Sequence, residues 1–284
     1  MSRRPLFLLA CCLAVGVTLL VWGQRSALNP AKSEDAAPGQ VAPTSGSVSA
    51  LSVFKDKVAA LPEGDQAKVA QLQAALDSLD GQEVQAAGIW KSLSSFWITR
   101  QDYLGGAVCL DLALALAPNA EDSRDAGLFY GSAGHALEGS DSVLLSFCRK
   151  RSVELLAKAL EAQPQDLDLK ADWANALVLS SPAPMQGVQA LMDIVRQEPK
   201  HLKAHSHLAR LAIESRQFPK AIQRYKNLLT WYPGLGAAYL GLGEAYYLSG
   251  SKDSAVFYLQ QYRGLVQDPE TQQQIDQYLQ ELNP

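Results

Sequence analysis

Two consecutive stretches decide the fold: LKAHSHLARLAIESRQFPKAIQRYKNLLTWYPGL at 202–235 and GAAYLGLGEAYYLSGSKDSAVFYLQQYRGLVQDP at 236–269. Each is 34 residues long, and small and apolar residues recur at the same places in both. The residues that recur at this spacing are Leu208 and Leu242, Ala209 and Gly243, Ala212 and Tyr246, Leu228 and Tyr262, and the series Gly187, Ala221 and Ala255. A fixed period of this length indicates internal repeats.

Each repeat has the pattern of two amphipathic helices joined by a short turn. Within 202–235, the apolar residues of 208–212 share one helical face, and those of 222–229 share another. Pro219 suits the first turn of the second helix, because a proline there loses no helical hydrogen bond. Pro233 ends that helix, since proline cannot continue the hydrogen-bond ladder. The period and the pattern together predict stacked helical hairpins.

These residues resemble the tetratricopeptide repeat (TPR), whose pattern has Leu-Gly/Ala-x-x-Tyr in the first helix, a small residue and an aromatic in the second, and a closing proline. The matching residues are Tyr239, Leu242, Gly243, Tyr246, Ala255, Leu259 and Tyr262 in 236–269, and Leu208, Ala209, Ala212, Ala221, Tyr225, Leu228 and Pro233 in 202–235. The resemblance implies an all-α, right-handed TPR-type solenoid of helical hairpins. Its units would be 87–120, 121–167, 168–201, 202–235 and 236–269.

The segments around these units depart from the pattern. Unit 121–167 is 13 residues longer than the others and is expected to form two lengthened helices, at Asp122–Leu137 and Val143–Ala162. Residues 50–86 are expected to form an N-terminal helical hairpin or cap, with helices at Ala50–Leu61 and Asp65–Leu79. Residues 270–284 are expected to form a polar C-terminal capping helix, which such arrays need in order to stay soluble.

The N-terminal part predicts where the protein resides. Residues Leu6 to Trp22 form an uncharged apolar run, which as a helix would measure about 26 Å. Two arginines lie within the first four residues and only Arg25 follows closely, so the N-terminus is expected to stay cytoplasmic. We therefore expect a cytoplasmic stub at 1–4, a transmembrane signal-anchor at 5–23 and a flexible linker at 24–49 rich in Ala, Pro, Ser and Gly.

This placement makes the protein a single-pass protein of the cell membrane with the bulk of the chain outside the cytoplasm, on the periplasmic side if the cell is bacterial. Two other interpretations of the N-terminal segment stay open. One is a signal peptide that is cleaved before Gln24. The other is a lipoprotein signal at Cys11, although the apolar run continues well past that cysteine.

Composition excludes several classes of protein. The net charge of −4 is a poor match to a nucleic-acid binder, which needs basic surface. Four cysteines in 284 residues cannot form a disulfide framework. The sequence contains no Gly-x-Ser-x-Gly elbow, no phosphate-binding loop and no dinucleotide glycine pattern. We therefore expect neither an enzyme nor a cofactor, and no small-molecule substrate.

The TPR resemblance implies a concave groove lined by the first helix of each unit, where a protein or peptide binds. The residues expected to face this groove are Lys203, Ser206, Arg210, Glu214, Asp172, Glu244, Tyr247, Lys91 and Ser95. Lys203 and Arg210 lie on one face of their helix, in a stretch, 196–226, with eight basic and two acidic side chains. The pair could hold an acidic ligand, or the stretch could be a solvated face that balances the acidic C-terminus.

Histidines and cysteines suggest two further sites. His201 and His205 have the i, i+4 spacing of metal ligands. However, His201 is expected to precede the helix, and no cysteine is near. We therefore interpret both as surface or groove histidines and expect no metal. Cys109 and Cys148 fall on second helices of adjacent units. They could form a disulfide outside the cytoplasm, but two buried free thiols are the simpler expectation.

The functional prediction is a membrane-tethered, extracytoplasmic TPR scaffold that binds a protein or peptide in its groove. One alternative is a TPR chaperone module that presents apocytochrome during biogenesis of c-type cytochromes, by similarity to the TPR part of bacterial cytochrome c maturation proteins. A second alternative is an enzyme that uses the elongated segment 121–167.

Overall fold

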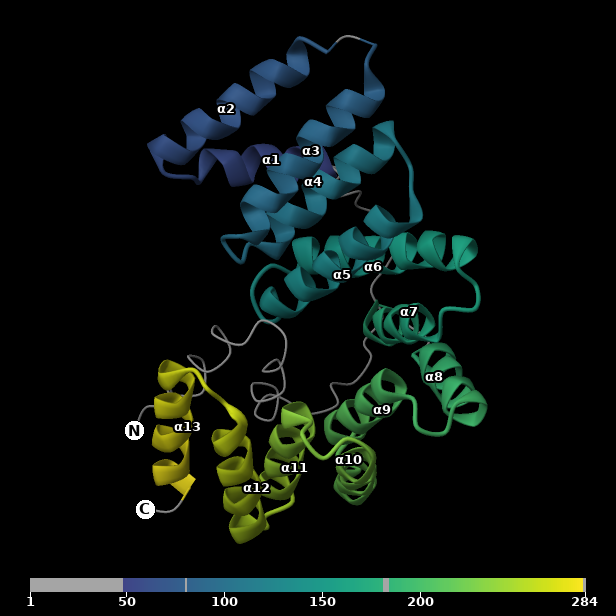
Figure 1. Cartoon of the computed structure of the whole chain (residues 1–284), viewed down its shortest axis with the longest axis vertical. Helices are drawn as coiled ribbons and strands as arrows, with labels where there is room; N and C mark the ends of the chain where they lie inside the picture. Colours follow the sequence, from purple (N-terminus) through teal and green to yellow (C-terminus); the bar gives the residue numbers. More distant parts are fainter. Residues whose placement is uncertain (1–47, 80, 181–183, 283–284) are drawn as a thin grey trace, which may run out of the picture. The chain divides into compact units, whose positions relative to one another are not determined.

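The computed structural model describes residues 48–79, 81–180 and 184–282, and every regular element in these ranges is an α-helix (Figure 1). The helices are α1 Ala50–Ala59, α2 Glu63–Asp77, α3 Glu83–Ile98, α4 Tyr103–Leu116, α5 Ala120–Ala136, α6 Ser142–Ala162, α7 Leu167–Ser180, α8 Met185–Gln197, α9 Leu202–Glu214, α10 Phe218–Trp231, α11 Gly236–Leu248, α12 Lys252–Leu265 and α13 Pro269–Leu282. The predicted all-α class is therefore confirmed for the described residues.

The predicted membrane anchor at 5–23 lies outside the described residues, as does nearly all of the predicted linker at 24–49. Among the helices that are described, none combines the length and apolar character that crossing a membrane requires. The anchor and the extracytoplasmic location stay predictions, and so do the handedness of the array and its division into repeats.

Short polar side chains set where several helices begin. Ser49 and Ser52 form a reciprocal capping box at the start of α1. Asp102, Asn119 and Asp141 accept backbone N–H groups at the starts of α4, α5 and α6. These caps satisfy amide groups that a helix would otherwise leave unpaired. They place the two lengthened helices, α5 and α6, within two residues of their predicted starts.

The described residues fall into two compact units, divided between Ala190 and Leu191, inside α8. In the unit before this division, α3 packs on α4, α4 on α5, α5 on α6 and α6 on α7. Figure 1 shows α5 and α6 side by side as the longest of these pairs. The hydrophobic core of this unit contains Leu93, Trp97, Val108, Tyr130 and Leu155, all of which are buried.

The first two helices contact the array as well as each other. Helix α1 has more contacts with α4 than with α2. Its Phe54 is buried and meets Trp90 of α3 edge to face, with ring centroids 4.9 Å apart, and Lys57 forms an ion pair with Asp102 at 2.6 Å. By contrast, Val69 is the only buried residue of α2. Because α2 offers so little apolar surface, α1 packs on the array itself.

A polar network joins three helices of this unit. The Arg151 guanidinium of α6 binds both carboxylate oxygens of Asp111 on α4, at 2.5 and 3.0 Å, and reaches Glu154 at 2.5 Å. The hydroxyl of Tyr130, on α5, donates to Asp111 at 3.1 Å. The Asp111 side chain is only 10% exposed, so the network is largely shielded from water.

The unit that follows the division contains α9 to α13. Consecutive helices pack on one another, and α9 also contacts α11. Small residues let them approach closely, because a Cβ atom on Gly243 would lie 2.7 Å from Leu259 of α12. Ala221 and Ala255, at equivalent places in the 34-residue period, have no exposed surface. Small residues that mark the repeat in the sequence thus lie where helices pack closely.

Candidate functional site

Six of the nine residues expected to face the groove, Glu214 included, lie in the unit formed by α9 to α13. Lys203, Ser206 and Arg210 belong to α9, and Glu244 and Tyr247 belong to α11, which contacts α9. Asp172 belongs to α7, in the other unit, and is buried. The five residues on α9 and α11, together with Glu214 and Tyr278, are called the α9–α11 face below.

Arg210 is not a free cation on this face. Its guanidinium forms an ion pair with Glu214, one turn further along α9, and the two side chains are 16% and 18% exposed. The i, i+4 spacing of the two residues brings them together on the helix surface. The positive charge of Arg210 is therefore already balanced, which weakens the expectation that Lys203 and Arg210 jointly hold an acidic ligand.

Glu244 is the most unusual residue of the face. It is 5% exposed, and its Oε2 atom is buried with no hydrogen-bond partner in the described part of the chain. Burial raises the pKa of its carboxyl to about 8, with a further contribution from the negative charge of Glu214, while Arg210 opposes the shift. The sequence placed Glu244 on this face but gave no sign that it is buried.

Helix α13 completes the surroundings of Glu244. Tyr278 of α13 packs edge to face against Tyr247, with ring centroids 6.2 Å apart, and its hydroxyl oxygen is buried without a hydrogen-bond partner in the described residues. Burial raises the pKa of Tyr278, and the charge of Glu244 adds to that shift. Sequence reasoning treated α13 as a polar cap and missed Tyr278, whose i, i+3 spacing from Ile275 is the signal that α13 buries one face.

The two histidines at i, i+4 have structural partners. The Nδ1 atom of His201 accepts the backbone N–H of Ala204 and caps α9. Nδ1 of His205 accepts from Arg224 at 3.4 Å, since a guanidinium can only donate. Nε2–H of His205 therefore donates to the carbonyl of Pro199 at 3.0 Å. No group of three or more His, Cys, Asp or Glu residues within the described ranges could hold a metal ion.

This geometry makes the unit sensitive to acid. Burial lowers the pKa of His205, and the charges of Arg224 and His201 lower it further. The unfolded chain therefore takes up the proton more readily, with a pKa near 6.5. The stability contributed by neutral His205 is present above about pH 6.5 and is lost as the pH falls below that value.

We expect the thermal midpoint of the wild-type protein to fall between pH 7 and pH 5, measured by circular dichroism. His205→Phe keeps a ring against Trp231, 4.9 Å away in the wild type, and cannot titrate. Its midpoint should be lower than that of the wild type at pH 7 but should change less across this range. An equally steep loss in His205→Phe would show that His205 is not responsible.

The two described cysteines are free thiols in the core of the other unit. Cys109 and Cys148 have no exposed surface, and burial raises the pKa of both thiols above its ordinary value. Of the two expectations for these residues, the free buried pair is the one that the structure has.

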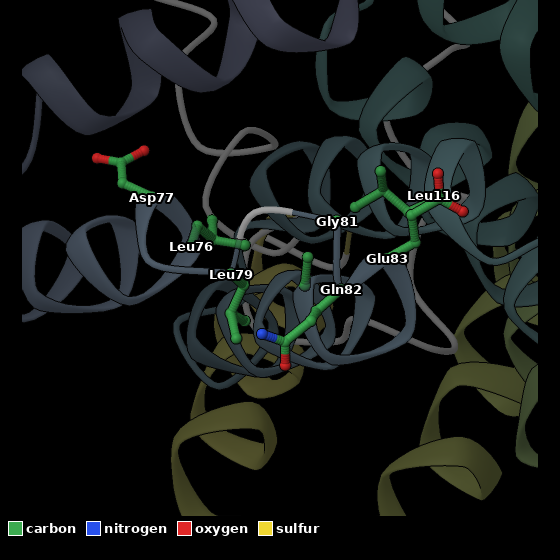
Figure 2. Close-up of a pocket in the computed structure, with 8 residues that line it drawn as sticks. Leu76, Asp77, Leu79, Gly81, Gln82, Glu83 and Leu116 are labelled. Atoms are coloured by element: carbon green, nitrogen blue, oxygen red, sulfur yellow. The ribbon is translucent and has the colours of Figure 1, made fainter.

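A shallow pocket of about 420 Å³ lies where α2 is followed by α3. Figure 2 shows Leu76 and Leu79 on one side and Glu83 beside Leu116 on the other, while the carboxylate of Asp77 points away from them. Polar groups do not converge on one point in this pocket. It therefore lacks the arrangement typical of a small-molecule site.

The elongated segment 121–167, on which the enzyme alternative depends, places several charged side chains in ion pairs. Arg124 pairs with Asp166 at 3.0 Å, Arg149 with Glu138 at 2.8 Å, and Arg151 with Asp111. These pairs join neighbouring helices or turns, which is a structural role. The enzyme alternative stays a prediction without support from these contacts.

Three solved structures illustrate what this chain is similar to. Among solved structures, MamA is 19% identical, covers 68% of this chain and 94% of its own, and has a TM-score of 0.42. A tetratricopeptide repeat protein from Parabacteroides merdae is 13% identical over 70% of this chain and 89% of its own, with a TM-score of 0.39. The TPR2AB domain of yeast Sti1, in a complex with pHSP90, is 15% identical over 70% and 99%, with a TM-score of 0.35.

No curated protein sequence matches this chain. Residues 212–274, which span the end of α9 to the first turns of α13, match the family model described as tetratricopeptide repeat. This match covers the stretch in which the 34-residue period is clearest, and the helices there pack in consecutive pairs. In residues 212–274, therefore, this chain is similar to the tetratricopeptide repeat family.

Proposed function

We propose that this chain is a membrane-tethered scaffold that binds a protein or peptide partner outside the cytoplasm. The observation that carries the proposal is the repeat match over residues 212–274, which include α10 to α12. The polar residues that α9 and α11 contribute to the α9–α11 face belong to two helices that contact each other. Stacked repeats of this kind create extended surfaces suited to other chains. The apolar run at 6–22 supports the tether, because two arginines precede it and a stretch rich in Ala, Pro, Ser and Gly follows.

Site-specific photocrosslinking in the source cell tests the partner. A photoreactive phenylalanine in place of Tyr247 or Ser206 is expected to crosslink to the same partner, because both positions are on the α9–α11 face. The matched control is Thr230, which is exposed on α10 of the same unit and should give no such adduct. Equal crosslinking from Thr230, or none from either face position, would contradict binding at this face.

Two variants then separate binding from folding. Ser206→Trp and Tyr247→Ala should each reduce recovery of the crosslinked partner while the circular dichroism spectrum stays that of the wild type. Arg210→Glu is a poor choice, because it would place a third carboxyl beside Glu214 and Glu244.

Cell fractionation tests the tether. The full chain should stay in the membrane pellet at high salt and be released by detergent, whereas a chain lacking 5–23 should be soluble. Added protease should degrade the repeat unit only from the extracytoplasmic side. Recovery of the intact full chain in the cytosol would overturn this part of the proposal.

A further inference from the structure

The Glu244 carboxyl is an unsatisfied group in a nearly closed site. Its side chain belongs to α11, is 5% exposed, and has one oxygen with no hydrogen-bond partner among the described residues. Native proteins pair almost all buried polar atoms, because a buried acceptor left unpaired costs about 1–3 kcal/mol. An exception of this kind indicates strain, an ordered water, or a group that is paired only when something binds.

The charged and titratable groups around Glu244 come from four helices. Helix α9 supplies Arg210 and Glu214, α10 supplies Tyr225, α11 supplies Tyr247, and α13 supplies Tyr278. Arg210 and Glu214 form an ion pair and cancel each other. Two polar atoms of this cluster have no hydrogen-bond partner among the described residues, namely the Glu244 Oε2 atom and the Tyr278 hydroxyl oxygen. A carboxylate oxygen is an acceptor, and a tyrosine hydroxyl can accept as well as donate. Both can receive a hydrogen bond from an incoming donor.

We propose that the α9–α11 face binds a lysine or arginine side chain of a peptide partner, and that the partner's cation takes the place of a proton on the Glu244 carboxyl. This inference rests on the proposed function and states which chemistry the partner carries. Before binding, Arg210, Glu214 and a protonated Glu244 sum to zero charge. After binding, the ligand cation and the ionised Glu244 also sum to zero, and one proton has passed to solvent.

The titration of Glu244 supports this exchange. Burial and the charge of Glu214 raise the pKa of Glu244 to about 8, so the carboxyl is mostly protonated at pH 7. A cation within a few ångströms favours the ionised form and lowers that pKa. Binding is therefore expected to strengthen as the pH rises toward 8, by up to about tenfold per pH unit, and to level off above it.

An acidic ligand fits the same face poorly. Its carboxylate would meet Glu214 and Glu244, and Arg210 already has an ionic partner. Lys203 is the remaining basic residue expected on this face, and a single lysine near the surface provides little net attraction. The sequence-based hypothesis of an acidic ligand and the proposed cation site therefore predict opposite ligand charges.

Isothermal titration calorimetry of the full chain in detergent micelles tests the proposal. The probes are two capped decapeptides, one alternating Lys and Gly, the other alternating Glu and Gly. We expect the lysine peptide to bind and to release about one proton at pH 7, measured from two buffers of different ionisation enthalpy. The glutamate peptide should not bind.

Glu244→Gln keeps the shape of the side chain but cannot release a proton. It should bind the lysine peptide at least tenfold more weakly, with no proton release and no dependence on pH between 6.5 and 8.5. Asp253→Asn is the matched control, since Asp253 is an exposed carboxylate on α12 and its replacement changes the net charge equally. It should bind like the wild type.

Each other outcome overturns the cation site. It falls if the lysine peptide does not bind, if Glu244→Gln binds as tightly as the wild type, or if the glutamate peptide competes. Circular dichroism spectra of both variants exclude unfolding as the cause. If photocrosslinking still captures a partner at Tyr247 after such a result, the scaffold function stands and only the cation site is lost. If neither experiment succeeds, both proposals fail.

Discussion

Gly187→Val is expected to lower the free energy of unfolding by about 3 kcal/mol or more, because α8 lies directly against α7 at this residue. A Cβ atom on Gly187 would collide with the backbone oxygen of Ala174 and would lie 2.6 Å from Cγ2 of Val178. Backbone cannot move aside as a flexible side chain can, so the two helices must separate. Urea denaturation followed by circular dichroism measures the loss.

The matched control is the same substitution at Gly88, which lies in α3 of the same unit. A Cβ atom there meets nothing within 4 Å. Gly88→Val should therefore leave stability unchanged or raise it by a few tenths of a kcal/mol, since valine restricts the unfolded chain more than glycine does. Similar destabilisation by the two substitutions would show that α7 and α8 are not in close contact.

Asp111→Ala should destabilise the protein by about 2–4 kcal/mol. The substitution removes both carboxylate oxygens that hold Arg151 and also the acceptor of the Tyr130 hydroxyl. Tyr130 has no exposed surface and Arg151 is mostly shielded, so both groups would lose their partner in a place that water reaches poorly. Such losses are costly because the remaining groups stay desolvated.

Lys68→Ala provides the contrast. Lys68 pairs with Asp65 at 3.7 Å, but its side chain is 69% exposed. Its removal should cost less than about 1 kcal/mol, as is usual for surface ion pairs. Thermal and urea midpoints of the two variants separate the cases. A cost for Asp111→Ala no greater than that for Lys68→Ala would mean that water reaches the three-helix network freely.

Much of the helical architecture could be predicted from the sequence because its signals are local. Helix caps such as Asp141, prolines and the apolar period determine where helices begin and end, and α13 begins within one residue of the expected start. Glycine positions at the 34-residue spacing, such as Gly187 and Gly243, also indicated places where helices pack closely. In each case the information lies within one helix or between two adjacent helices.

The rest depends on contacts that no local pattern specifies. The packing of α1 on α4 joins residues far apart in the sequence, as Lys57 and Asp102 show. The surroundings of Glu244 include Arg210 and Glu214 of α9 and Tyr278 of α13. The sequence pattern alone gives the side of α11 on which Glu244 lies but not what surrounds it. For the same reason Arg210 was expected to be available, although Glu214 was visible one turn away. Charge balance at a site depends on rotamers as well as on spacing.

The buried thiols give the unit before the α8 division its own reporter of transient opening. Cys109 and Cys148 lie in one hydrophobic cluster, and neither side chain is accessible in the folded state. A water-soluble alkylating reagent can modify them only in molecules whose helices have separated. The rate at which these two cysteines are labelled therefore measures how often the core opens under native conditions. Equilibrium spectra do not detect such rare openings.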